Sequence, residues 1–280
     1  MSTGHILLLG AIAGGTIFLG LPMARLQALG PATRAGLSAL ATGILLFLLW
    51  DVLSGAVSPI EHRLEVRHWG SFAGYAALGL GGFALGLMSL VYYAEWMKKR
   101  ANRRTTTLVG PGAAATDEFR QRGWIEALTP GLQLALLIAV GIGVHNFGEG
   151  LAIGQAAAAD EVSLALVLII GFALHNATEG FGIVGPMSGE AERPSWGFLA
   201  LMGLIGGGPT FVGTVIGQAW VSEALGVVFF ALAAGSILYV VIQLLEVCRR
   251  HAMPVVVAWW ILAGIVLGFA TDFVLVAAGA

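Results

Sequence analysis

Two copies of one polar pattern, His-Asn-x-x-Glu-Gly, interrupt two otherwise apolar stretches of the chain. The six polar residues are His145, Asn146 and Glu149 in the first copy and His175, Asn176 and Glu179 in the second. Residues four apart lie on the same face of a helix, so the histidine and the glutamate of each copy project together. Imidazole nitrogens, amide oxygens and carboxylates suit divalent Zn, Fe, Mn or Cd. The pattern indicates a metal site, and the alternatives are a hydrogen-bonded polar network or a proton relay.

The two motifs sit in a chain that is apolar almost throughout. Of its 280 residues 58% are hydrophobic and 11% are charged, whereas a soluble domain has about 25% charged residues. Eight apolar stretches are long enough to cross a bilayer as helices. They span residues 5–29, 35–57, 69–97, 130–157, 162–187, 196–221, 224–247 and 254–279. The composition therefore predicts an all-α integral membrane protein with eight transmembrane helices.

The predicted spans place both motifs at the same depth. His145 lies near the middle of span 130–157 and His175 near the middle of span 162–187. The short connection between them makes these spans antiparallel neighbours, so the two motifs can face each other. An acidic side chain at the centre of a membrane helix costs about 2.5–3.5 kcal/mol. A bound cation would offset that cost, and the alternative is that the acids keep their protons.

The basic residues are distributed unequally between the two sides of the predicted bundle. The connections after the first, third, fifth and seventh spans hold twelve of the fourteen Lys and Arg residues, and only Arg63 and Arg67 lie on the other side. Cytoplasmic loops carry such an excess. The count therefore predicts that both termini are extracytoplasmic.

The chain is predicted to form a single transmembrane transporter domain, residues 1–280. Residues 98–126 are predicted to form a mobile cytoplasmic loop, because that segment is polar and rich in Gly, Pro and Thr. In span 196–221, Pro209 follows three glycines and leaves the carbonyl of Ile205 without its helical donor. This predicts a broken helix near the midplane, which is typical of transporter sites but equally of a kink that aids packing.

The paired motifs, the eight spans, the outward termini and the loop at 98–126 resemble the ZIP family (Zrt-/Irt-like proteins) of divalent metal transporters, prokaryotic type. The resemblance covers essentially the whole chain. It implies a 3+2+3 arrangement of helices with inverted repeats, and import of zinc or a related metal (Cd, Fe or Mn) into the cytoplasm by alternating access. It assigns as metal ligands or near-ligands His145, Asn146, Glu149, His175, Asn176 and Glu179. It also implies a homodimer.

The sequence departs from the family at two positions. Gly208 stands where many members have a glutamate before the proline, and Gln243 stands where an acidic residue is often found. Both differences remove negative charge, so a single-metal site is expected. Asp51 is a candidate for attracting an entering cation, and Glu246 for assisting its exit. For Asp51, and for Asp272 at a similar depth, a packing or interfacial role is the alternative; for Glu246 the alternative is contact with water beside Arg249.

A divalent metal importer in a prokaryotic plasma (inner) membrane is the function that these features favour. The metal is then the substrate; no cofactor, enzymatic activity or nucleic-acid partner is expected, and the lipid bilayer is the surrounding partner. An intramembrane metal-dependent hydrolase is an alternative, but Asn follows each His where an H-E-x-x-H protease has its general base. A non-transporting metal sensor is a further alternative. It is less favoured because the sequence predicts no separate soluble domain that could pass on a signal.

Overall fold

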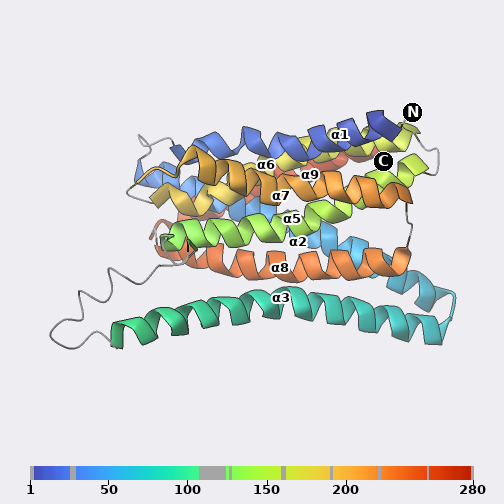
Figure 1. Ribbon diagram of the computed structural model, residues 1–280, viewed down its shortest axis with the longest axis horizontal. Helices are drawn as coiled ribbons and strands as arrows, with labels where there is room; N and C mark the ends of the chain where they lie inside the picture. The colour runs from blue at the N-terminus through green and yellow to red at the C-terminus, as the bar shows by residue number, and fades with distance from the viewer. Residues whose placement is uncertain are drawn as a thin grey trace.

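A computed structural model describes residues 3–25, 30–106, 124–125, 128–158, 162–189, 192–219, 222–250 and 252–278. Side chains at some further helical positions, His175 among them, lie outside the described part. The helices form an elongated bundle with their axes roughly parallel (Figure 1). The α-helices are α1 (Thr3–Gly15), α2 (Pro31–Glu65), α3 (Trp69–Thr106), α5 (Pro130–Ala158), α6 (Val162–Val184), α7 (Trp196–Ala219), α8 (Glu223–Arg250) and α9 (Pro254–Ala278). The described residues also form three short 3-10 helices: η1 (Thr16–Leu19) and η2 (Leu21–Arg25) after α1, and η3 (Gly185–Gly189) after α6.

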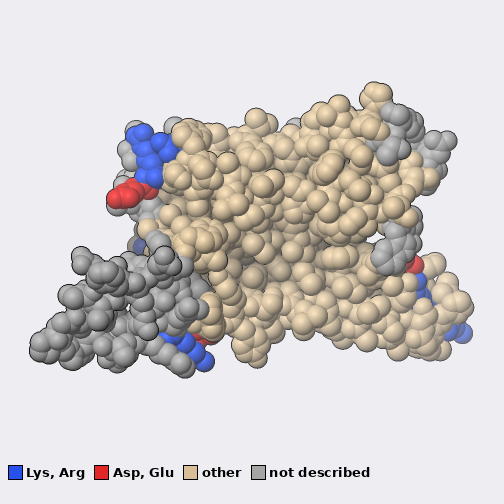
Figure 2. Space-filling view, viewed as in Figure 1, with Lys and Arg blue, Asp and Glu red and all other residues tan. Residues whose placement is uncertain are grey.

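The apolar character of these helices matches a membrane environment. Within the described residues, seven helical segments are long and apolar enough to cross a membrane, and no strand occurs. Charged side chains gather at the two ends of the bundle, and the visible face between them is uncharged (Figure 2). The prediction of an all-α, multi-pass membrane protein is therefore confirmed. The helix α6 (Val162–Val184) corresponds to the remaining predicted span, residues 162–187.

Several helix boundaries follow from local sequence. Pro31, Pro130 and Pro254 begin α2, α5 and α9, because the first turn of a helix does not need the N–H that proline lacks. Thr129 precedes α5, and its hydroxyl accepts a hydrogen bond from the Leu132 N–H at 3.4 Å. Ser195 caps α7 in the same way, with its hydroxyl 3.1 Å from the Phe198 nitrogen.

Two features of the helices differ from the predicted ones. The helix α3 continues to Thr106, so the first residues of the segment predicted as a mobile loop, 98–106, are helical. Residues 107–123 of that segment lie outside the described part. The helix α7 is α-helical from Trp196 to Ala219 with Pro209 inside it, so the expectation of a broken helix was wrong.

The helices divide into two groups by their contacts. The first helix group is α1, α5, α6 and α7, in which α5 and α1 each pack against both α6 and α7. The second helix group is α2, α3, α8 and α9, in which α2 packs against α8 and α9, and α3 packs against α8. The two groups meet where α5 contacts α8 and where α6 contacts α2 and α9.

Helices within a group approach each other backbone to backbone. A Cβ atom added at Gly150 of α5 would meet the carbonyl oxygen of Thr210 in α7, and one added at Gly213 of α7 would meet that of Phe147 in α5. The pairs α2–α9 and α3–α8 show the same reciprocal arrangement, through Gly43 with Gly264 and Gly86 with Gly235 respectively. Small residues allow such close approach in membrane helices.

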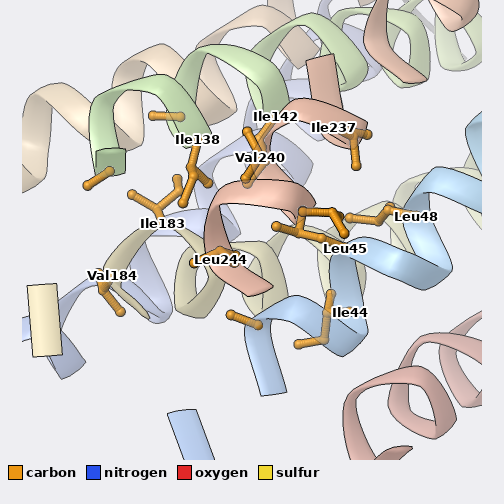
Figure 3. Close-up of a cluster of buried hydrophobic side chains, with 14 of the residues drawn as sticks. Ile44, Leu45, Leu48, Ile138, Ile142, Ile183, Val184, Ile237, Val240 and Leu244 are labelled. Atoms are coloured by element: carbon orange, nitrogen blue, oxygen red, sulfur yellow. The ribbon is translucent and has the colours of Figure 1, made fainter. Parts of the chain in front are cut away.

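The two groups meet through side chains instead. At Gly141 of α5 an added Cβ would make only ordinary contact, 3.7 Å from Ser236 Cβ of α8. Between the groups lies a cluster of aliphatic side chains (Figure 3). Its labelled members are Ile44, Leu45, Leu48, Ile138, Ile142, Ile183, Val184, Ile237, Val240 and Leu244. The rings of Phe147 in α5 and Phe229 in α8 also lie 4.8 Å apart, so the interface between groups is made by aliphatic and aromatic side chains.

Candidate metal centre

The polar motif of α5 is buried inside the bundle. His145 and Glu149 each expose 3% of their surface and Asn146 exposes none. In α6, Asn176 and Glu179 are likewise fully buried. The side chain of His175 lies outside the described residues, so its predicted place among the ligands has no structural account. Five of the six motif side chains thus occupy positions from which water is excluded.

Side chains from α5 and α6 converge on one another. The Nε2 atom of His145 lies 3.2 Å from Glu149 Oε1 on the same helix and 3.9 Å from Glu179 Oε1 on the neighbouring helix. The amide Nδ2 of Asn146 donates a hydrogen bond to Glu179 Oε2 at 3.0 Å. The i, i+4 spacing therefore does place His145 and Glu149 together, and the packing of α5 on α6 adds Glu179.

Two backbone carbonyls from other helices hold the asparagines. The Nδ2 atom of Asn146 also donates to the carbonyl of Gly206 in α7, and Nδ2 of Asn176 donates to the carbonyl of Ala13 in α1, each at 3.0 Å. Ala13 stands just before α1 gives way to the 3-10 turns of η1. Sequence reasoning placed the metal ligands on the two motif helices and missed both contacts. Gly14 and Gly207 were the available signal, because a Cβ atom at either one would meet the carbonyl oxygen of the other, so these glycines let α1 and α7 come this close.

Several buried oxygens at this junction lack a hydrogen-bond partner among the described residues. They are Asn146 Oδ1, Glu149 Oε2, Asn176 Oδ1 and Thr210 Oγ1. An unsatisfied buried polar group costs about 1–3 kcal/mol, and four of them on the two motif helices and the adjoining α7 call for a common explanation. Their chemistry, all oxygen acceptors beside an imidazole and a second carboxylate, is what a divalent cation would satisfy.

The described side chains do not form a closed metal cage. Among them, no group of three or more His, Cys, Asp and Glu residues is arranged to hold a metal ion. Glu149 and Glu179 both approach the same atom, His145 Nε2, at 3.2 Å and 3.9 Å. A cation bound by these three side chains would take its remaining ligands from amide oxygens or from residues outside the described part.

Asp51 is the predicted pathway residue that the structure connects to this centre. On α2 it is half-buried, and its charge interacts with those of His145 and Glu149 on α5 and of Asp272 on α9. It therefore faces the centre from the second helix group, and Asp272 is a further charged neighbour of Asp51.

Two of the other predicted pathway residues make contacts outside the centre. Glu246, near the end of α8, forms ion pairs with Arg249 and, at 3.6 Å, with Arg250. Gln243 is half-buried on the same helix, and its place on the pathway stays a prediction. A Cβ atom at Gly208 would meet only the Leu204 side chain of its own helix, at 3.4 Å. Gly206, two residues earlier, is the position of α7 that contacts Asn146.

The chain was compared with models of known protein families and with curated proteins, and neither comparison finds a match.

Proposed function

We propose that the chain is a divalent transition-metal importer of the ZIP type, which carries Zn, Cd, Fe or Mn across a membrane through the centre between α5 and α6. One observation carries the proposal: His145, Glu149 and Glu179 converge, fully buried, in the middle of a bundle of membrane-spanning helices. Charge at that depth costs several kcal/mol and is characteristic of ion pathways. The paired motif supplies the resemblance to that family, and the centre is proposed to hold one metal ion at a time.

The two helix groups support transport by alternating access. All described motif side chains belong to the first helix group, and Asp51 faces them from the second. The groups touch through aliphatic and aromatic side chains, whereas each is held internally by backbone contacts at glycines. A movement of the first group along the second would carry the centre from one side of the membrane toward the other without breaking those internal contacts.

The second helix group carries a further internal tie at one end. Arg63 of α2 bonds to Glu223 of α8, with 2.6 Å between Nη2 and Oε2, and lies 3.4 Å over the ring of Tyr75 in α3. Its Nε also donates to Ser71 Oγ of α3 at 2.9 Å. These contacts support treating α2, α3 and α8 as one unit.

The proposed orientation follows the basic residues. The beginning of α1 and the end of α9, which mark the two chain termini, lie at the same end of the bundle (Figure 1). Most Lys and Arg residues belong to connections at the opposite end. By the positive-inside rule the basic end is cytoplasmic, so transport into the cytoplasm of a prokaryotic cell is proposed, with a homodimer as the proposed assembly.

The test is metal flux into liposomes that contain the purified protein and an internal metal-sensitive dye. Zn²⁺, Cd²⁺, Fe²⁺ and Mn²⁺ are each added outside, and wild type is compared with the Glu149→Gln/Glu179→Gln double variant. Saturable flux in wild type and background flux in the double variant are expected. Flux through wild type that does not saturate, or equal flux through both proteins, would contradict the proposal.

Metal affinity is expected to fall as the pH is lowered. The histidine and the carboxylates must be deprotonated to coordinate a cation, so protons and metal compete for the same atoms. For each proton displaced, affinity drops by about tenfold per pH unit over the range in which the ligands titrate. Equilibrium binding of Mn²⁺ to the detergent-solubilised protein, measured from about pH 8 to about pH 5, checks this. A pH-independent affinity would exclude these side chains as ligands.

A further inference from the structure

Thr210 of α7 differs from the other buried hydroxyl residues that the structure describes in the helices. Thr42, Thr214 and Ser236 each donate a hydrogen bond to the carbonyl four residues earlier in their own helix, at 2.8, 2.8 and 3.0 Å. For Thr210 that carbonyl belongs to Gly206, and it accepts the amide of Asn146 instead. The Thr210 hydroxyl is fully buried and has no hydrogen-bond partner among the described residues. The same asparagine that binds Glu179 has thus taken the acceptor that Thr210 would ordinarily use.

Thr210 stands where three helices meet beside the candidate metal centre. Its carbonyl faces Gly150 of α5, the residue after Glu149, and its Cβ lies 3.0 Å from the point where a Cβ of Gly14 in α1 would be. The preceding residue in α1, Ala13, supplies the carbonyl that binds Asn176. Thr210 and Asn176 therefore approach the same peptide of α1, from α7 and α6 respectively.

Two amide oxygens of the motif are in the same state as the Thr210 hydroxyl. Asn146 Oδ1 and Asn176 Oδ1 share with Thr210 Oγ1 both full burial and the lack of a partner in the described chain. Neutral hydroxyl and amide oxygens are hard donors, which suit Mn²⁺, whereas imidazole nitrogen is a borderline donor that suits Zn²⁺ and accommodates the softer Cd²⁺. The described donors thus comprise one imidazole, on α5, and several oxygens, among them the Thr210 hydroxyl on α7.

We propose that the Thr210 hydroxyl is a further oxygen donor of the transported cation, and that it biases the centre toward Mn²⁺ relative to Cd²⁺. The inference rests on the proposed function, since it assigns a selectivity residue to that same site. Its physical basis is that Asn146, by occupying the Gly206 carbonyl, leaves this hydroxyl available to a ligand. The donor set of the centre then includes α7, although position 208 itself carries no side chain.

The test compares Thr210→Val, which has nearly the same shape without the hydroxyl, with Thr210→Ser, which keeps it. Thr214→Val is the matched control, because Thr214 is equally buried one turn along α7 and its hydroxyl is bonded within the helix. Equilibrium binding of Mn²⁺ and of Cd²⁺, each alone, is measured on the full chain in detergent. For Thr210→Val we expect a loss of Mn²⁺ affinity of about tenfold or more and a smaller loss for Cd²⁺. Thr210→Ser and Thr214→Val are expected to retain the wild-type Mn²⁺/Cd²⁺ ratio.

An unchanged Mn²⁺/Cd²⁺ ratio in Thr210→Val, whether both affinities stay the same or both fall equally, would overturn the assignment while leaving the metal centre in place. Wild-type protein that binds neither ion would overturn the proposed function and this inference together. Thermal unfolding of each variant without metal verifies the fold, and Thr210→Ala takes the place of the valine variant if that one does not fold.

Discussion

The Glu179→Gln protein is expected to lose saturable metal flux and yet, without metal, to unfold at the same temperature as wild type or a higher one. Glu179 is fully buried and Asn146 is its hydrogen-bond donor. A carboxylate in the centre of a membrane helix costs about 2.5–3.5 kcal/mol, and glutamine keeps the shape while removing the charge. The metal loses a charged ligand, so flux at a fixed metal concentration should fall by at least about 100-fold. Metal added to wild type should raise its unfolding temperature, and this rise should vanish in the variant.

These two readouts separate a functional carboxylate from a structural one. If Glu179 mainly stabilised the fold through Asn146, the variant would unfold at a lower temperature without metal, and flux would fall only in proportion to the folded fraction. That outcome would contradict the metal-ligand assignment. Glu61→Gln, at an exposed position of α2, is the control and should resemble wild type in both measurements.

Gly213→Ala is expected to destabilise the protein by about 1–3 kcal/mol, the usual range for inserting atoms into a close-packed contact. The added methyl group would run into the carbonyl oxygen of Phe147 in α5, and backbone cannot yield as a flexible side chain can. Because α5 carries His145 and Glu149, any separation of α5 from α7 also lengthens the bond from Asn146 to the Gly206 carbonyl. Thermal unfolding in detergent, followed by light scattering or tryptophan fluorescence, measures the effect.

Gly208→Ala is the matched control for this variant. It lies five residues earlier on the same helix, and its added methyl group would be 3.4 Å from the Leu204 side chain and close to nothing else outside its helical neighbours. We expect stability within about 0.5 kcal/mol of wild type or slightly above it, since alanine is the better helix former. Equal destabilisation of both variants would show that the register of α7 against α5 differs from the one described.

The sequence predicted the helices well because their main determinant is local. A segment that spans a membrane must be apolar over its whole length, and proline at positions 31, 130 and 254 fixes where three helices begin. The helix ends were predicted less well. The helix α2 runs from Pro31 to Glu65 with Pro59 inside it, past the apolar stretch at 35–57, because a more polar sequence does not by itself end a helix. Pro209 did not break α7, since a single missing N–H is tolerated when neighbouring helices pack closely around it.

At the candidate centre the sequence determined which polar groups share a face. Helical periodicity alone places His145 beside Glu149, and the short turn between α5 and α6 makes those helices neighbours. The remaining partners depended on tertiary structure: the Gly206 and Ala13 carbonyls, the Thr210 hydroxyl and the approach of Asp51. Every residue has a backbone carbonyl, so the sequence does not show which carbonyls will bind a side chain. Which helices meet is decided by glycine contacts between distant segments. The motif therefore identified the chemistry, and only the packing of α1, α2 and α7 around it decided what surrounds a bound cation.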